Sequence, residues 1–141
     1  MQIRPLTDQL SVSPQIGLDD LAQLASAGFR SVINNRPDGE AADQPSSAQL
    51  AEAAARHAMG YRYVPVVPGQ FDQDTVDAMA QALDALPPPV LAFCRTGTRS
   101  TSVWALQACR HTDADELLKI AREAGYDLGA LAPRLRAGQD A

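Results

Sequence analysis

A cysteine at the end of a short apolar run carries the strongest chemical signal in the chain. Residues 90–93, Val-Leu-Ala-Phe, have the length and composition of a buried strand, and Cys94 follows directly. The polar loop 95–99, Arg-Thr-Gly-Thr-Arg, then leads into a segment with helical spacing of apolar residues. Loop amides and the free N–H groups of a helix N-terminus together form an anion site. The order of these parts therefore predicts a nucleophilic cysteine at the bottom of such a site.

Each part of this loop has an expected task. The positive potential of the amides favours the thiolate of Cys94, which would form a covalent intermediate. Arg99 would hold two oxygens of a bound oxyanion through its planar guanidinium. Ser100 would donate a hydrogen bond to the sulfur and so make it a better leaving group. The remaining loop residues are expected to bind substrate: Arg95, Thr96, Gly97 and Thr98.

The elements that position this loop form an alternating series of strands and helices. Such a series predicts an α/β fold with a mostly parallel sheet of about four to five strands, covered on both faces. Sites in these sheets lie at the carboxyl ends of the strands, so loops 35–40 and 68–74 should join loop 94–99. Arg36 and Asp38 are therefore candidate substrate contacts, although the turn signal Pro37-Asp38-Gly39 explains them equally well.

The expected elements can be stated in chain order. They are an edge strand with a turn over 10–16, a helix over 18–28, a strand over 29–34, a helix from Ser46 or Ser47 to Met59, a strand over 61–67, a helix over 75–86, the strand 90–93, a helix after the cysteine loop, a helix over 113–125 and a short helical piece over 126–135. The whole chain, 1–141, should form one domain, with residues 137–141 as a frayed tail.

Charge and cysteine usage limit the partners. The formal net charge of −5 argues against binding to nucleic acid or to an anionic membrane. Against this background Arg95 and Arg99 indicate a small anionic substrate. Cys94 and Cys109 are separated by a predicted helix, so no structural disulfide is expected, which suits the cytoplasm. The sequence suggests no metal site and no cofactor.

Three segments resemble the phosphatase-like domain family of beta-lactamase-hydrolase-like proteins. They are residues 11–15 (Ser-Val-Ser-Pro-Gln), 31–40 (Ser-Val-Ile-Asn-Asn-Arg-Pro-Asp-Gly-Glu) and 93–100 (Phe-Cys-Arg-Thr-Gly-Thr-Arg-Ser). The resemblance runs from about Leu6 to Leu135. It implies the three-layer α/β/α fold of dual-specificity phosphatases, with the nucleophile at Cys94. Members are variously labelled phosphatases, hydrolases and sulfur transferases, so the resemblance implies the fold more firmly than the reaction.

The sequence departs from the cysteine-phosphatase pattern at three places. Only four residues separate Cys94 from Arg99, where those enzymes have five, and Phe93 stands in place of the usual histidine. Pro68 falls where their aspartic general acid is expected, which leaves Asp72 and Asp74 as the nearest substitutes. The shorter loop resembles that of rhodanese-type sulfurtransferases, and sulfur transfer needs no strong general acid.

Three hypotheses follow. In the first, a sulfurtransferase, the Cys94 thiolate takes the outer sulfur of thiosulfate or a persulfide and passes it to a thiol acceptor such as glutathione. In the alternative, a phosphatase, the same residues hydrolyse phosphate esters through a phosphocysteine, with Asp72 or Asp74 as the possible acid. Aryl phosphates would suit it best, since their leaving groups are weakly basic. The third is a non-catalytic module that binds oxyanions.

Overall fold

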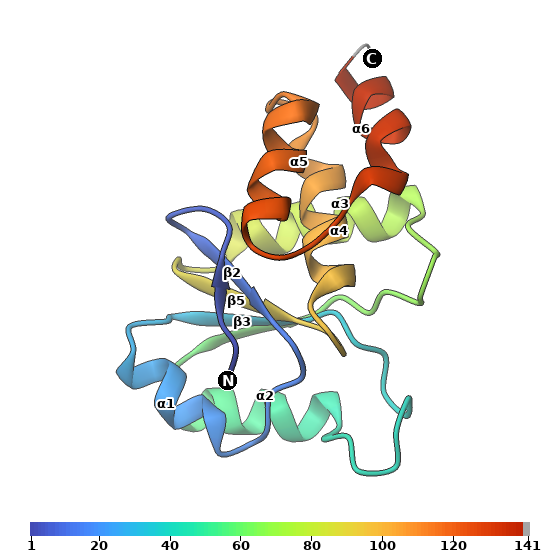
Figure 1. Ribbon diagram of the computed structural model, residues 1–141. Helices are drawn as coiled ribbons and strands as arrows, with labels where there is room; N and C mark the ends of the chain where they lie inside the picture. The colour runs from blue at the N-terminus through green and yellow to red at the C-terminus, as the bar shows by residue number, and fades with distance from the viewer. Residues whose placement is uncertain (140–141) are drawn as a thin grey trace.

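A five-stranded sheet forms the middle layer of the protein, and helices cover both of its faces (Figure 1). The structure is a computed structural model and describes residues 1–139. The strand order is β1-β2-β5-β3-β4, and every neighbouring pair is parallel except β1 and β2. The strands are β1 Arg4–Pro5, β2 Leu10–Ser13, β3 Ser31–Asn34, β4 Gly60–Tyr63 and β5 Val90–Phe93. The predicted three-layer α/β/α fold is confirmed.

The helices divide between the two faces of the sheet. Two of them, α1 and α2, lie on one face, and α3 to α6 lie on the other (Figure 1). Their bounds are α1 Asp20–Ser26, α2 Ser47–Arg56, α3 Gln73–Ala85, α4 Thr98–Ala108, α5 Ala114–Glu123 and α6 Ala132–Gln139, with a 3₁₀ turn, η1, at Gly129–Leu131. Among the described residues, no helix has the length and apolar character needed to cross a membrane.

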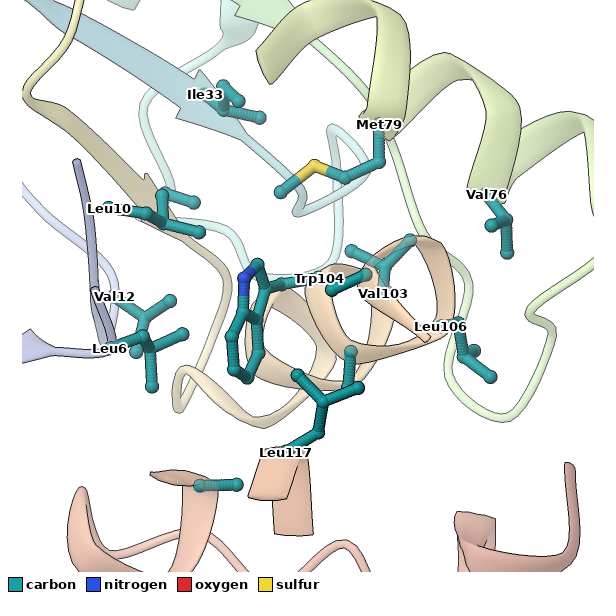
Figure 2. Packing of buried hydrophobic residues seen from close by; sticks show 14 of the residues in the cluster. Leu6, Leu10, Val12, Ile33, Val76, Met79, Val103, Trp104, Leu106 and Leu117 are labelled. Atoms are coloured by element: carbon teal, nitrogen blue, oxygen red, sulfur yellow. The ribbon is translucent and has the colours of Figure 1, made fainter. Parts of the chain in front are cut away.

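Alternation along the strands separates the core into two clusters. Val32, Leu91 and Phe93 pack with residues of α1 and α2. Their strand neighbours Ile33 and Ala92 belong to the larger cluster under α3 to α6. In Figure 2, Trp104 of α4 lies at the centre of that larger cluster, with Leu10 and Val12 of the sheet on one side and Leu117 of α5 below. The three inner strands, β2, β5 and β3, are thus buried on both faces.

The register places the ends of the three inner strands level with one another. Ser13 of β2 and Asn34 of β3 both pair with Phe93 of β5. Cys94 directly follows the last residue of β5, so the loops that follow β2 and β3 leave the sheet beside it. This edge of the sheet carries the candidate site.

Several element bounds differ by two or three residues from the sequence-based expectations, and four differences concern the fold around the site or the C-terminus. The strand predicted as an edge strand, β2, lies inside the sheet, because the two-residue β1 pairs along its outer side. The opposite edge strand, β4, ends at Tyr63 rather than at residue 67, before Pro65. Helix α3 begins two residues earlier than expected, at Gln73. Helix α6 runs through residues 137–139, which were predicted as a frayed tail, and residues 140–141 lie outside the described range.

Candidate active site

Cys94 lies at the carboxyl end of the central strand, and its side chain is fully buried. Its Sγ accepts a hydrogen bond from the backbone N–H of Gly97, with an N···S distance of 3.0 Å. Gly97 is the N-cap of α4 and has a φ of 96°, in the left-handed region that favours glycine. The tight turn that this φ permits brings the loop back over the sulfur.

The first turn of α4 supplies further donors. The amides of Arg99 and Ser100 lie in this turn, where an α-helix offers no acceptor of its own. The Oγ of Ser100 is buried and has no hydrogen-bond partner. A loop of this kind can bind an anion, because free N–H groups and the positive end of the helix dipole point the same way.

Arg99 is held in place by a carboxylate from another loop. Its two terminal nitrogens bind the two oxygens of Glu40 at 2.7 and 2.8 Å, a bidentate pair. Hydrogen bonding to Glu40 and the negative charge of the nearby Cys94 raise the pKa of Arg99. The guanidinium therefore stays charged, in a fixed orientation, beside the sulfur.

Arg36 completes this ion-pair cluster. Its Nε donates to Glu40 at 2.9 Å and one terminal nitrogen donates to Gln15 at 3.1 Å. The side chain is only 8% exposed. The hydrogen bond from Arg99, reinforced by that from Arg36, lowers the pKa of Glu40 to about 2 against the cost of its burial. Glu40 is therefore ionised at neutral pH and serves as an anchor for both arginines.

A third segment reaches Arg99 from the region after β4. The carbonyl of Val66 accepts from the Arg99 guanidinium at 2.8 Å. Asn35 fixes this segment through two hydrogen bonds. Its backbone carbonyl accepts from the Val66 amide, and its side-chain amide donates to the carbonyl of Val64. The expected meeting of loop 35–40 with the cysteine loop is thus confirmed. Loop 68–74 was also expected to meet the cysteine loop. The contact with Arg99 comes instead from Val66, two residues before that loop.

Tyr126, from the connection between α5 and η1, closes the remaining side of the loop. Its hydroxyl donates to the carbonyl of Thr96, with an O···O distance of 3.2 Å. Its ring lies against Gly97, where an added Cβ would come within 2.8 Å of the ring carbon Cζ. Burial, followed by the negative charge of Cys94, raises the pKa of Tyr126, so its hydroxyl keeps its proton at neutral pH.

The other predicted site residues of the cysteine loop lie on its outer side. Arg95, Thr96 and Thr98 are exposed. The carbonyl of Arg95 accepts from the amide of Gln15, which ties the loop to the segment after β2. The hydroxyl of Thr96 donates to that of Thr98 at 3.1 Å.

The carboxylates that the sequence singled out act at the starts of helices. Asp38 accepts from the amide of Ser47 at the beginning of α2. Asp72 is the N-cap of α3 and accepts from the amide of Thr75 at 2.8 Å. Asp74 is exposed in the first turn of the same helix. In the described part of the chain, no group of three or more His, Cys, Asp or Glu side chains is arranged to hold a metal ion.

The comparisons with known proteins agree with this geometry. Residues 2–110 match the family model described as "Beta-lactamase hydrolase-like protein, phosphatase-like domain". The chain belongs to this family. A beta-lactamase hydrolase-like protein of Xylella fastidiosa is 32% identical over 131 residues, which cover 92% of this chain and 30% of the relative. The phosphatase-like domain described here therefore spans less than a third of the curated relatives it matches.

Solved structures show the same fold for phosphatase-like domains. A candidate phosphatase from Neisseria meningitidis superposes with a TM-score of 0.87 at 32% identity and covers 99% of both chains. The catalytic domain of a PP-IP phosphatase from S. cerevisiae gives a TM-score of 0.67 at 12% identity, over 97% of this chain and 84% of that domain. At that identity the likeness shows the fold alone. The fold is that of the cysteine phosphatases.

Two residues of the site escaped the sequence-based prediction. Glu40 lies at the end of the segment 31–40 that carries the family resemblance, but its partner Arg99 is 59 residues away. Tyr126 lies outside the range matched by the family model, in a segment predicted only as a helical piece. For Glu40, an acidic residue in a loop expected to meet an arginine was an available signal.

Proposed function

We propose that this domain hydrolyses phosphate monoesters through a phosphocysteine on Cys94. The observation that carries the proposal is the loop geometry, in which the Gly97 amide points at the Cys94 sulfur and Glu40 fixes Arg99 beside it. Membership in a phosphatase-like family and the phosphatase fold of its neighbours support phosphoryl transfer as the reaction class.

The reaction has two steps. In the first, the Cys94 thiolate attacks phosphorus, an S–P bond forms, and the P–O bond to the leaving group breaks. The free amides of the α4 first turn and the remaining donors of Arg99 bind the equatorial oxygens. In the second, water attacks the phosphocysteine, the S–P bond breaks, and the sulfur departs as a thiolate. The free hydroxyl of Ser100 would stabilise it, and the proton from water passes to the phosphate product or to solvent.

The preferred substrates are esters with weakly basic leaving groups, such as aryl phosphates. Glu40 is held ionised by two arginines and has no proton to give at neutral pH. Asp72 is occupied as a helix cap, and its hydrogen bonds with Thr75 lower its pKa. An aryl oxide can depart without a proton, whereas loss of general acid catalysis slows alkyl esters by about 10²–10⁴-fold.

Turnover of p-nitrophenyl phosphate by the purified chain tests this proposal. We expect Cys94→Ser to abolish turnover, because serine is not ionised at neutral pH. Cys109→Ser is the matched control, since this second cysteine is buried at the C-cap of α4 and donates to the carbonyl of Leu106. Arg99→Lys should lower kcat/KM by about 10²–10³-fold, the usual cost of losing an oriented donor. Equal activity of the wild type and Cys94→Ser would refute the proposal.

Sulfur transfer, the first hypothesis from the sequence, is the second candidate. The comparisons give it no support, and they favour its phosphatase alternative. One observation speaks for it: the loop from Cys94 to Arg99 has six residues, one fewer than in cysteine phosphatases. Incubation with thiosulfate followed by intact-mass measurement would reveal a one-sulfur adduct on Cys94, which a phosphatase should not form. This second candidate would also need a thiol acceptor, such as glutathione, and a cytoplasmic location would supply it.

A further inference from the structure

One peptide group in the cysteine loop is held at both ends. Between Thr96 and Gly97, the carbonyl oxygen accepts from the Tyr126 hydroxyl at 3.2 Å. The N–H of the same peptide group donates to Cys94 Sγ at 3.0 Å. The phenol and the sulfur are therefore hydrogen-bonded to opposite ends of a single peptide group, which links them.

The ring of Tyr126 fits this peptide group closely. An added Cβ on Gly97 would meet the Cζ and Cε1 atoms of the ring at 2.8 and 3.2 Å. The absence of a side chain at Gly97 thus serves two purposes: it permits the positive φ, and it leaves room for the ring. The ring limits rotation of the peptide away from the sulfur.

Arg99, Glu40 and Tyr126 are ionisable side chains that the structure places around the sulfur of Cys94. Arg99 carries the nearby positive charge, and Glu40 lies behind it. Tyr126 comes from the connection after α5. Its pKa is raised by burial and by the charge of Cys94, and lowered by that of Arg4 in β1. Because burial and the charge on Cys94 raise the pKa of Tyr126, the phenol remains a donor throughout the neutral range.

We propose that Tyr126 is a positioning residue for the nucleophile: its hydroxyl fixes and polarises the Thr96–Gly97 peptide, whose N–H stabilises the Cys94 thiolate. A hydrogen bond to a carbonyl oxygen strengthens the donor at the other end of the same amide, as in hydrogen-bonded chains. The inference rests on the nucleophilic role of Cys94 in the proposed function. It requires no particular substrate.

Alkylation of Cys94 by iodoacetamide, followed by mass spectrometry, tests the inference without substrate turnover. In Tyr126→Phe the ring and its packing remain and only the hydroxyl is lost. We expect alkylation at pH 6 to slow by roughly threefold, the effect of one ordinary hydrogen bond. At pH 9 the two rates should converge, because alkali ionises thiols whether or not a hydrogen bond assists them. This pH-dependent difference separates stabilisation of the thiolate from a change in access.

Two further proteins sharpen the test. Tyr63→Phe is the matched control, because the Tyr63 hydroxyl accepts from the Asp38 amide in another loop, and its alkylation profile should match the wild type. Site-specific 3-fluorotyrosine at position 126 keeps the fold and makes the phenol a stronger donor, so alkylation at pH 6 should become faster. The proposal is overturned if Tyr126→Phe reacts like the wild type at pH 6, or if it is slowed equally at both pH values. Normal alkylation behaviour without phosphatase turnover would instead reject the proposed function alone.

Discussion

Glu40 is the side chain on which the orientation of Arg99 depends. It binds both terminal nitrogens of Arg99 and the Nε of Arg36, so one carboxylate fixes two guanidiniums from different elements. The remaining donors of Arg99 are left for a bound anion. A residue with no contact to substrate can thus decide whether the anion site is formed before substrate arrives.

The stability of Glu40→Gln should respond to acid less than that of the wild type. The pKa of Glu40 in the folded protein is about 2, below its ordinary value of 4.5. A depressed pKa stabilises the fold above pH 4.5, and this contribution is lost as the pH falls toward 2. Melting temperatures at pH 7, 4 and 2.5 should therefore fall more steeply for the wild type, and the variant should melt lower at pH 7.

The matched control for this experiment is Glu52→Gln. Glu52 also forms an i,i+4 ion pair with an arginine, Arg56, but both side chains are about two-thirds exposed or more. Exposed pairs contribute little to stability. This control should keep the wild-type dependence on pH. If the profiles of Glu40→Gln and the wild type coincide, the ion-pair cluster does not stabilise the fold.

At the scale of elements, the sequence predicted the features that depend on neighbouring residues in the chain. The strand β5, the cysteine loop and α4 follow one another directly, so their order could be predicted from one segment. The expectation of an anion site came from the same segment. The two-residue β1 is too short to leave a hydrophobic pattern, which explains why β2 was taken for an edge strand. Glu40 is 59 residues from its partner Arg99 in the sequence, and Tyr126 is 30 residues from its partner Thr96. A local sequence pattern cannot predict contacts between residues so far apart.

The start of α3 offers a test of whether Asp72 acts as a cap or as an acid. Its carboxylate caps the helix by accepting from Thr75. Asparagine is as good a cap as aspartate but cannot donate an acidic proton. We expect Asp72→Asn to keep the wild-type melting temperature and Asp72→Ala to melt a few degrees lower. In both variants the ratio of aryl to alkyl phosphate turnover should stay unchanged. A selective loss of alkyl phosphate turnover in Asp72→Asn would identify this residue as the general acid.

At the scale of the whole molecule, the C-terminal helices are part of the core and of the site. Leu117 of α5 lies beside Trp104 in this cluster (Figure 2), and both Leu117 and Leu135 of α6 are almost fully buried in it. The connection between these helices carries Tyr126 to the cysteine loop. The part of the chain beyond residue 110, which the family model does not cover, therefore contributes both stability and one wall of the site.

Leu117→Ala should lower the free energy of unfolding by about 2–5 kcal/mol, because it leaves a cavity in this cluster. Urea denaturation measures the change. Lys119→Ala, on the exposed face of the same helix, is the control and should have little effect, since the side chain of Lys119 is 66% exposed. A loss below about 1 kcal/mol in Leu117→Ala would mean that α5 packs less tightly on α4 than described.

The central claim is that Cys94 accepts a phosphoryl group and then releases it to water. Acid quenching during turnover of p-nitrophenyl phosphate, followed by intact-mass and peptide analysis, measures this directly. We predict a single phosphoryl adduct on Cys94, present in the wild type and more abundant in Ser100→Ala, whose sulfur lacks the hydroxyl that assists its departure. Phosphate release with no adduct on Cys94 at any quench time, in either protein, would contradict the account.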